Sequence, residues 1–451
     1  MPTFLIINNY IMQKILLVLL LLSAIAPKLK AQLYFPPTTG TTWDTVQPVT
    51  LGWCPALVDS LVDYVGARNS RAFILLKDGK IVAEAYYGNF TRDSLWYWAS
   101  AGKTLTAFTV GIAQQEGHLS IQDTTSDYLG TGWTACTPAQ EAAITIRHQL
   151  TMTSGLDDGV ADVNCTLDTC LQYLAPASTR WAYHTGVYTR LDGVIANATG
   201  QTLNAYFTQK VKNRIGMTGA FFLSGYNNVY VSNARSMARF GLLILNRGNW
   251  DGTQIMTDTA YFNQMVNTSQ ALNPSYGYLW WLNGKSSFMV PSLQLSFPNS
   301  WNPSAPADMF AAIGKNGQLI NVVPSQNLVF IRMGEAADNS DVSFTLNDTI
   351  WQKLNLAMNS CTTVGINITP IINNDYQIYP NPTTGALHIS GAMAATKAIV
   401  FDALGRVVAQ QDNINLPISL DLGHLPQGAY WLSLAAQNGE ILTRKLVILQ
   451  P

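Results

Sequence analysis

The chain has 451 residues, of which 48% are hydrophobic and 12% are charged, against about 25% charged in an average soluble domain. It is long enough for two or three domains with a sizeable core, so a disordered protein is excluded. The formal net charge is -1 and no run of basic residues occurs, so we expect no nucleic-acid partner.

The first 31 residues are typical of a signal peptide. Residues 15–25 are almost wholly apolar, Lys14 precedes them, and a short polar stretch leads to Ala31. Met12 is a candidate for the true start, because Lys14 then belongs to a conventional basic n-region. An uncleaved anchor is the alternative, but the apolar run is short for a span of about 20 residues. We expect cleavage after Ala31, export, and no transmembrane helix in the mature chain.

Export permits disulfide bonds, and all 5 cysteines lie beyond the expected signal. Cys165 and Cys170 are close in sequence, so we expect them to pair across a small loop. Cys54 and Cys361 bracket the central region and are candidates to tie its ends together, which would leave Cys136 free. The alternative is that all five are buried thiols. We expect no metal site, because no histidine clusters with them.

The first periodic segment follows a Thr- and Pro-rich N-terminal extension, residues 32–51. Residues 55–65 are predicted to form an amphipathic helix, because Pro55 stands at the first turn and apolar side chains recur at helical spacing. Residues 72–87 are predicted to form a hairpin, because an Asp-Gly turn at 78–79 separates two apolar runs.

The middle of the chain alternates between helix and strand patterns. The further helices that we predict are residues 105–116, 144–156, 191–198, 231–246 and 348–358, and the strands are residues 276–283, 288–295, 309–313, 319–323 and 328–333. Residues 52–361 are therefore expected to form one α/β domain of the α+β type. Its antiparallel sheet takes its edges from both ends of the domain, helices flank the sheet, and a helical subdomain is inserted.

The composition changes after Cys361. Residues 362–375, rich in Thr, Ile and Asn, are predicted to form a linker. Residues 376–451 contain short alternating strands between turn signals, which predicts a small all-β sandwich domain.

A Ser-x-x-Lys pair, Ser100 and Lys103, stands just before the apolar helix 105–116. At the first turn of a helix this spacing brings both side chains to the same side. A serine hydroxyl needs a base to become a nucleophile, and lysine is a base only if burial or nearby charge lowers its pKa from about 10.4. Apolar neighbours such as Trp98 can supply that burial. Alone the motif is weak, because a capping serine beside a solvated lysine has the same spacing.

Such a hydrolase also needs a proton shuttle and donors for the oxyanion. Tyr183, in a turn before a helix, is the candidate shuttle, and a core tyrosine is the alternative. Residues 314–318 open a strand with two glycines, which allow close approach of a substrate. We expect the amides of Ser100 and Gln318 to form the oxyanion hole and Lys315 to bind a substrate carboxylate. A plain β-turn with an exposed lysine is the alternative.

Three motifs in chain order resemble those of the serine β-lactamase and penicillin-binding-protein superfamily, most of all its class C and esterase branch. They are Ser100-x-x-Lys103, Tyr183-x-Thr185 and Lys315-Asn316-Gly317. The resemblance implies Ser100 as the acylated nucleophile, Lys103 as its base and Tyr183 as the proton shuttle. The positions expected to bind substrate or oxyanion are Thr185, Lys315, Asn316, Gly317 and Gln318. We expect no cofactor.

Two positions depart from the β-lactamase pattern: Thr185 stands where many members have Asn, and Asn316 where they have Thr. Both concern substrate binding, so they favour an esterase, an amidase or a 6-aminohexanoate-oligomer hydrolase over a dedicated β-lactamase. We therefore expect a secreted serine hydrolase that cleaves an ester, amide or β-lactam bond in a small-molecule or peptide-like substrate. The rival function is a surface-displayed binding protein on a catalytically inactive hydrolase fold.

The tail is similar to the C-terminal sorting domain of type IX secretion. The matching stretches are Tyr379-Pro380-Asn381-Pro382, Gly405-Arg406, Leu425-Pro426-Gln427-Gly428-Ala429-Tyr430 and Lys445. The resemblance implies the outer-membrane secretion machinery as a partner and a protein that is secreted or attached to the cell surface.

Overall fold

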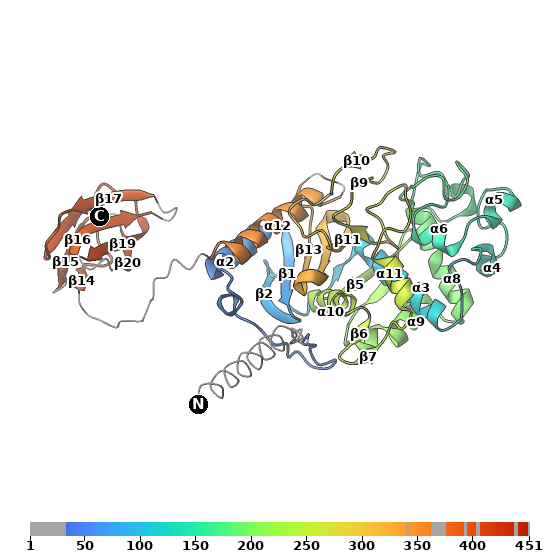
Figure 1. The fold of residues 1–451 in the computed structure, drawn as a ribbon, viewed down its shortest axis with the longest axis horizontal. Helices are drawn as coiled ribbons and strands as arrows, with labels where there is room; N and C mark the ends of the chain where they lie inside the picture. The colour runs from blue at the N-terminus through green and yellow to red at the C-terminus, as the bar shows by residue number, and fades with distance from the viewer. Residues whose placement is uncertain are drawn as a thin grey trace, which may run out of the picture. The chain divides into compact units, whose positions relative to one another are not determined.

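The computed structural model describes residues 33–361 except 339 and 341, and residues 376–449 except 392–394, 403–405 and 437–440. The expected signal peptide and linker lie outside the described residues. The chain divides into two compact units, Met1–Thr362 and Thr363–Pro451 (Figure 1). Among the helices of the described residues, none has the length and apolar character that a bilayer crossing requires.

The first unit is built on a six-stranded antiparallel sheet with the order β2-β1-β13-β12-β11-β8. Its strands are β1 (Ser70–Lys77), β2 (Lys80–Tyr86), β8 (Trp281–Leu282), β11 (Phe310–Gly314), β12 (Gln318–Val323) and β13 (Leu328–Gly334). The predicted hairpin is β1–β2, and its turn places Asp78 and Gly79 at φ 52° and 82°. β2 forms one edge, as expected. The other edge is β8, because the C-terminal strand β13 pairs with β1 inside the sheet.

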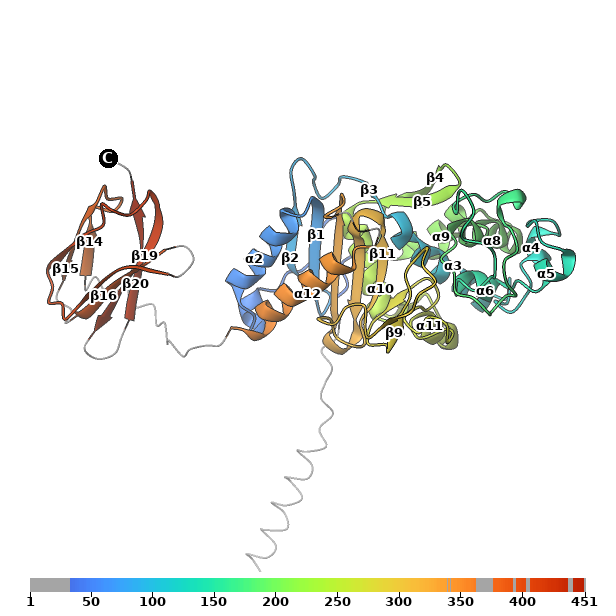
Figure 2. The same ribbon diagram turned by 90° about the horizontal axis from the view of Figure 1, so that it is seen from above.

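Helices cover both faces of this sheet. α2 (Pro55–Gly66) and α12 (Phe344–Asn359) pack together on one face, and α10 (Ala234–Leu245) covers the other (Figures 1 and 2). Side-chain alternation explains the division. On β12, Asn321 accepts a hydrogen bond from the indole of Trp351 in α12, whereas its neighbour Ile320 packs against Gly241 of α10. The predicted α+β domain is thus confirmed.

The remaining helices gather at one end of the sheet, which is the right-hand side of Figure 1. They are α3 (Lys103–Gln115), α4 (Ser126–Leu129), α5 (Pro138–Ala142), α6 (Ile146–Leu150), α7 (Thr185–Thr189), α8 (Leu191–Thr199), α9 (Leu203–Lys210) and α11 (Thr259–Met265). A three-stranded sheet of order β3-β5-β4 lies beside them, with β3 (Trp96–Tyr97), β4 (Ala220–Ser224) and β5 (Asn227–Ser232). Short pairs are formed by β6 (Asn249–Trp250) with β7 (Thr253–Gln254), and by β9 (Ser287–Phe288) with β10 (Phe297–Pro298).

Two helix predictions have wrong bounds. The helix predicted over 144–156 is only α6, which ends before Met152 and Gly155 adopt φ 57° and 80°. At Gly155 a Cβ would lie 2.1 Å from the carbonyl oxygen of Ala175, so the chain turns there by close packing. The helix predicted over 231–246 begins at Ala234, because Val231 belongs to β5 and Asn233 caps α10 by accepting from the Ser236 amide.

Two strand predictions are also largely wrong. Residues 276–283 and 288–295 contribute only the two-residue strands β8 and β9. Leu279 and Ser292 have φ of 63° and 61°, which breaks the extended conformation that a strand needs. The aromatic side chains of residues 276–280 are nevertheless buried, although their backbone is irregular.

The second unit is a small all-β sandwich, as predicted. One antiparallel sheet has the order β14-β15-β18 and the other β17-β16-β19-β20. The strands are β14 (Tyr376–Tyr379), β15 (Ala386–Gly391), β16 (Ala395–Phe401), β17 (Val407–Asp412), β18 (Ile418–Asp421), β19 (Gly428–Ala436) and β20 (Ile441–Ile448). Both sheets contribute to one core, for example Leu387 from the first and Leu432 from the second. This core is separate from that of the first unit.

We expect a chain cut at residue 365 to keep the fold of the first unit, because among the described residues the buried core of that unit ends at Ala357 and Met358 is the last residue that packs against it. Its thermal midpoint should stay within a few degrees of the full-length value, and the protein should no longer be secreted. A melt of the purified truncated protein and a comparison of cells with medium check both parts. Aggregation of the truncated chain would contradict the separation.

Cys54 and Cys361 are free thiols in the structure. Cys54 caps α2, and its amide donates to Ala357 of α12 over 2.8 Å. The Cys361 thiol contacts the Cys54 thiol, and this contact raises the pKa of Cys361. A protein disulfide or dioxygen as oxidant should therefore link them. Non-reducing peptide mapping should find this pair and leave Cys136 alkylatable; any link to Cys136 would contradict the prediction.

Candidate active site

Ser100 lies in a tight turn between the central sheet and the start of α3. It belongs to the 3-10 helix η2 (Ala99–Gly102), which leads directly into α3. Ala99 has φ 46°, a left-handed conformation that costs energy for a residue with a side chain and is typical of functional turns. The turn is held from below by Trp98, whose amide donates to Tyr230 and whose indole donates to Ser232, both over 2.8 Å.

The end of β11 approaches this turn closely. At Gly314 a Cβ would lie 2.3 Å from the carbonyl oxygen of Trp98 and 2.9 Å from the amide of Ala101. Only glycine permits this approach, so Gly314 fixes the distance between the sheet edge and Ser100. Ile313, Gly314 and Lys315 therefore line the cavity in front of the nucleophile.

Lys103 lies directly beside the serine. Its Nζ lies 2.8 Å from Ser100 Oγ, and the residue is only 4% exposed. Nζ also lies over the rings of Tyr183 and Tyr188, at 5.2 Å and 4.7 Å from their centroids. No ion pair with Lys103 occurs in the described part of the chain. Burial therefore lowers the pKa of Lys103 to about 7, so a large fraction of the lysine is neutral at physiological pH.

Tyr183 also lies beside Ser100 and Lys103. Its ring stacks on Trp281 at 6.3 Å and meets Tyr276 edge-on at 6.2 Å. Burial raises its pKa to about 12, and contacts with the hydroxyls of Ser100 and Tyr276 oppose that rise. The phenol is therefore protonated at neutral pH and lies beside the nucleophile, as a proton donor requires.

The segment around Tyr183 is held by backbone packing. His184 caps α7, since its Nδ1 accepts from the Val187 amide over 3.3 Å, and burial lowers its pKa to about 4, so the ring is neutral. Gly186 donates to Val163, and a Cβ there would lie 2.1 Å from the Cys165 carbonyl oxygen. The loop closed by the Cys165–Cys170 disulfide, with Cα atoms 5.9 Å apart, is thus pressed against α7. Thr185, the first residue of α7, lines the cavity.

Residues 315–317 form the hairpin turn between β11 and β12. Asn316 and Gly317 have φ of 64° and 74°, the pattern that an Asn-Gly turn adopts. The Asn316 amide donates to the Tyr97 hydroxyl over 2.7 Å. Neither Asn316 nor Gly317 lines the cavity, so these two predicted binding residues shape the turn from outside.

Arg332 anchors this turn from β13. The guanidinium is fully buried and donates to Ser70 Oγ and to the carbonyl oxygens of Arg68, Asn316, Gly317 and Glu335. A Cβ at Gly317 would lie 2.6 Å from its Nη1. Burial lowers the pKa of Arg332 to about 10. All of its N–H donors bind uncharged oxygen acceptors, so the guanidinium holds the turn in place and has no donor left for a substrate.

Gln318 is also placed away from the cavity. It is fully buried, its side chain donates to Gly334 and Lys315 oxygens and accepts from the Gly334 amide, and its backbone pairs with Gly314. Lys315, by contrast, is exposed and lines the cavity on both sides of Ser100. The structure thus brings Ser100, Lys103, Tyr183, Thr185 and Lys315 together at the cavity. The predicted binding residues Asn316, Gly317 and Gln318 do not line it.

The cavity has two lobes that meet at Ser100 and Lys315. The polar lobe, about 450 Å³, is lined by the neutral polar residues Asn164, Thr185, Ser224, Asn227 and Asn228 together with Tyr97, Tyr188 and Phe222. The apolar lobe, about 540 Å³, is lined mainly by Val163, Tyr183, Trp281, Val290, Pro291, Ile313, Val342 and Phe344. Among the described residues that line either lobe, the only charged side-chain types are Lys103 and Lys315.

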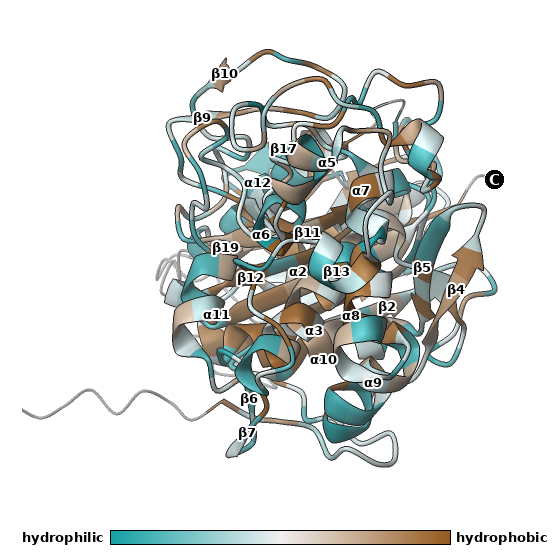
Figure 3. Ribbon diagram, turned by 90° about the vertical axis from the view of Figure 1, so that its right-hand side faces the viewer, coloured by the Kyte–Doolittle hydropathy of each residue, from teal (hydrophilic) through white to brown (hydrophobic). Residues whose placement is uncertain are grey.

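The β4–β5 hairpin forms one wall of the polar lobe, and sequence reasoning missed its role. β4 is the brown, hydrophobic strand at the edge of the molecule in Figure 3. Phe222 lines the lobe, and Leu223 beside it is 79% exposed. The signal in the sequence is the Asn227-Asn228 pair in an otherwise apolar strand, which marks side chains that need polar partners.

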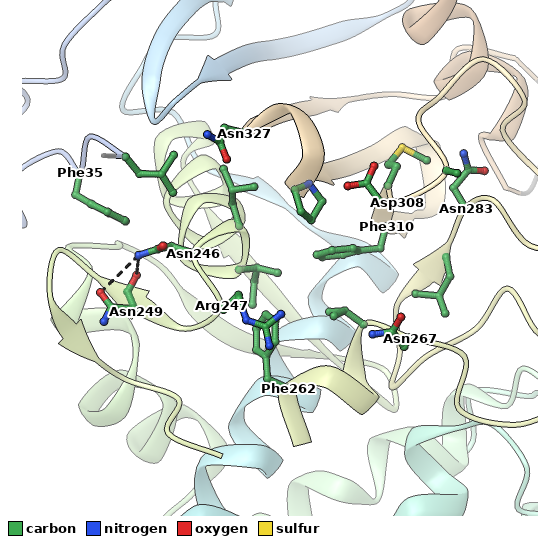
Figure 4. Close-up of a pocket in the computed structure, with 18 of the residues that line it drawn as sticks. Phe35, Asn246, Arg247, Asn249, Phe262, Asn267, Asn283, Asp308, Phe310 and Asn327 are labelled. Carbon is green, nitrogen blue, oxygen red and sulfur yellow. Dashed lines mark hydrogen bonds between the residues drawn. The ribbon is translucent and has the colours of Figure 1, made fainter. Parts of the chain in front are cut away.

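A larger cavity of about 710 Å³ lies elsewhere, between the N-terminal segment, the end of α10 and α11 (Figure 4). Its polar side chains are largely engaged with their neighbours: Asn246 donates to Asn249, and Asp308 accepts from Ser325. None of the proposed catalytic residues reaches it. Size alone therefore does not identify the active site here.

Solved structures with the same fold are bacterial hydrolases and their homologues. A putative 6-aminohexanoate-dimer hydrolase from Bacillus anthracis aligns at TM-score 0.54 and 17% identity, covering 73% of this chain and 90% of its own. A putative β-lactamase from Bacteroides dorei aligns at TM-score 0.53 and 17% identity, covering 70% of this chain and 100% of its own. An uncharacterised protein of Alkalihalophilus pseudofirmus is 24% identical over an alignment of 310 residues that covers 60% of this chain and 84% of that protein.

Family models match both units of the chain. Residues 377–449 match the secretion system C-terminal sorting domain, so the protein is exported by type IX secretion and is released or displayed at the cell surface. Residues 58–353, which contain all the residues around the two-lobed cavity, match the model named Beta-lactamase. The chain therefore belongs to the Beta-lactamase family of serine-hydrolase folds, extended by a secretion sorting domain.

Proposed function

We propose that the protein is a secreted serine hydrolase that forms an acyl-enzyme on Ser100 and cleaves an ester or amide bond. One observation carries the proposal: a lysine whose pKa is lowered to about 7 by burial lies 2.8 Å from the serine hydroxyl. A neutral amine can accept the hydroxyl proton, whereas a charged one cannot. A capping serine beside a solvated lysine, the alternative considered above, does not fit a lysine that is only 4% exposed.

The reaction follows from the positions of three side chains. Lys103 takes the Ser100 proton as Oγ attacks the carbonyl carbon, and Tyr183 gives a proton to the leaving atom. Water then attacks the acyl-serine with Lys103 or Tyr183 as base. We assign the oxyanion to the amides of Ser100 and Lys315, because both residues border the two lobes and each stands at the start of a 3-10 turn, where amides lack helical acceptors. Gln318, buried and paired with Gly314, is the weaker choice.

Esters and amides are favoured over β-lactams as substrates. The strand that borders Ser100 ends in Ile313 and Gly314, so no lysine side chain stands on that strand to hold a β-lactam carboxylate. Lys315 follows it on an exposed turn and remains a candidate for binding a carboxylate. A catalytically inactive binding protein is the rival, and labelling of Ser100 by a fluorophosphonate, with Ser100→Ala as control, separates the two.

The acylation rate should rise with pH through about 7, because the pKa of Lys103 is lowered to about 7 and only its neutral form accepts a proton. Lys103→Arg should reduce acylation by about 10³-fold or more, because a guanidinium is not a base at these pH values. Stopped-flow acylation by a p-nitrophenyl ester between pH 5 and 9 measures both.

Lys103→Met gives the matched control for this prediction. Folding holds the lysine pKa below its unfolded value of about 10.4, so the native state loses stability as pH falls from 10 to 7, by up to about 4 kcal/mol. The methionine variant should therefore be inactive yet at least as stable at pH 7. Near-normal turnover of Lys103→Arg, or a clearly destabilised Lys103→Met, would assign the lysine a structural role.

Tyr183→Phe should slow turnover by about 10²-fold for substrates with poor leaving groups and much less for activated aryl esters, because the phenol donates to the leaving atom. Phenylalanine keeps the ring contacts with Trp281 and Tyr276, so the thermal midpoint should change little. Steady-state kinetics on paired alkyl and p-nitrophenyl esters measure the difference. Equal losses on both substrates would place Tyr183 outside the proton transfer.

A further inference from the structure

Asn227 and Asn228 line the polar lobe, and the amide oxygen of Asn227 lacks a hydrogen-bond donor among the described residues. Asn228 donates its Nδ2 hydrogen to Asp192 Oδ2 over 2.8 Å, which fixes the orientation of the amide and leaves Asn228 Oδ1 as an acceptor. Asn227 donates to Asn164 Oδ1 over 3.3 Å, and its own Oδ1 is buried without a partner among the described residues. A buried unpaired acceptor costs free energy unless a ligand supplies the donor. This side of the cavity is therefore complementary to N–H groups.

Asp192 stabilises this arrangement from α8. Burial raises the pKa of its carboxyl to about 7, and the hydrogen bond from Asn228 opposes the rise. Burial favours the neutral form of this carboxyl, and no acidic side chain lines the lobe among the described residues. The lobe thus offers hydrogen-bonding groups and the exposed cation Lys315, but no negative charge.

The apolar lobe has more apolar side chains in its lining than the polar lobe. Trp281, Val290, Ile313 and Phe344 line it, and no acidic or arginine side chain does so among the described residues. Lys315 is its one cation, at the boundary with the polar lobe. An ionised group deep in this lobe would lose its hydration without gaining a partner.

The position of Tyr183 indicates which lobe receives the leaving group. The tyrosine lines the apolar lobe, whereas Lys103 and Thr185 line the polar lobe. Because Tyr183 is the proposed donor to the leaving atom, the leaving group occupies the apolar lobe and the acyl group the polar lobe.

We propose that the substrate is an ester or amide whose acyl part carries amide N–H groups and whose leaving group is apolar and uncharged, with Asn227 and Asn228 as specificity-determining residues. This rests on the proposed function. In the reaction the acyl–oxygen or acyl–nitrogen bond breaks and one water is consumed. Its OH joins the acyl group as a carboxylic acid, and its remaining proton leaves with the alcohol or amine.

Four esters test both halves of the proposal on the full-length mature protein. N-acetylglycine and N-acetyl-N-methylglycine, the second lacking the N–H, are each esterified to 4-methylphenol and to 4-hydroxybenzoate. Each kcat/KM is divided by the rate of spontaneous hydrolysis. We expect the N–H acyl group to be preferred by about tenfold, the worth of one buried hydrogen bond, and the 4-methylphenyl leaving group to be preferred by a similar factor over the carboxylate-bearing one.

Single substitutions test which lobe causes each substrate preference. Asn227→Ala should bring the N–H to N-methyl ratio close to one, whereas Asn267→Ala, a matched change at the distant cavity of Figure 4, should leave the ratio as in the wild type. Val290→Lys should shift the leaving-group ratio toward the carboxylate-bearing ester by about fivefold, as one partly exposed ion pair allows. Thermal melts exclude misfolding of each variant.

Two sets of results would overturn the inference, and they differ from failure of the proposed function. Ser100-dependent hydrolysis without these preferences, or with a preference for the N-methyl acyl or the carboxylate-bearing leaving group, refutes the assignment of the lobes alone. Failure to hydrolyse any of the four esters, together with no fluorophosphonate label on Ser100, refutes the serine hydrolase and the inference with it.

Discussion

The burial of Lys103 is the constraint on which the rest of the site depends. Among the described residues an ammonium group here has no anion to compensate its desolvation, so the neutral amine is favoured. That state exists only while α3, the Tyr183 segment and the edge of the sheet keep water away from Nζ. The proposed hydrolase chemistry therefore depends on how these segments pack, not on the Ser-x-x-Lys pair by itself.

Close backbone contacts provide that packing. Gly314 meets the Trp98 carbonyl, Gly186 meets the Cys165 carbonyl, and Gly317 meets the Arg332 guanidinium, each at a distance that excludes a Cβ. Each contact joins a segment bearing a site residue to another segment of the first unit. Together they fix the positions of Ser100, Tyr183 and the end of β11 relative to one another, which the proposed acyl transfer requires.

Much of this arrangement could be predicted from local sequence, because local patterns specify it. The hairpin at Asp78, the helix after Lys103 and the three strands from 310 to 334 each follow a strong period or turn signal. The failures have a common cause. Residues 276–282 and 288–295 are mainly apolar, but most of them form irregular chain with positive φ at Leu279 and Ser292, and apolar composition alone does not distinguish this from a strand.

The third motif shows the same limit at the site itself. Residues 314–318 were expected to open a strand, and they do lead into β12, but Lys315-Asn316-Gly317 form the turn after β11 and it is β11 that approaches Ser100. The stretch that borders Ser100 is Ile313-Gly314-Lys315. The pairing of β11 with β12 places the turn at residues 315–317, and the approach of Gly314 to Trp98 places the end of β11 beside Ser100. The second contact joins residues that are far apart in sequence, so the local pattern does not reveal it.

Catalysis and selectivity rest on different kinds of structure in this protein. The proposed catalytic groups come from the start of α3, the segment before α7 and the end of β11, all locked by core packing and by glycine contacts. The lobes are walled in part by the β4–β5 hairpin and by residues 290–292, which lie outside the central sheet. Substitution at an exposed position of these segments, such as Phe222, changes which groups a substrate can bury. Tyr230 and Ser232 of β5 are different, because they hold Trp98 beneath the Ser100 turn. The proposed catalytic centre would thus serve different ester or amide substrates through changes confined to the exposed part of one hairpin and one loop.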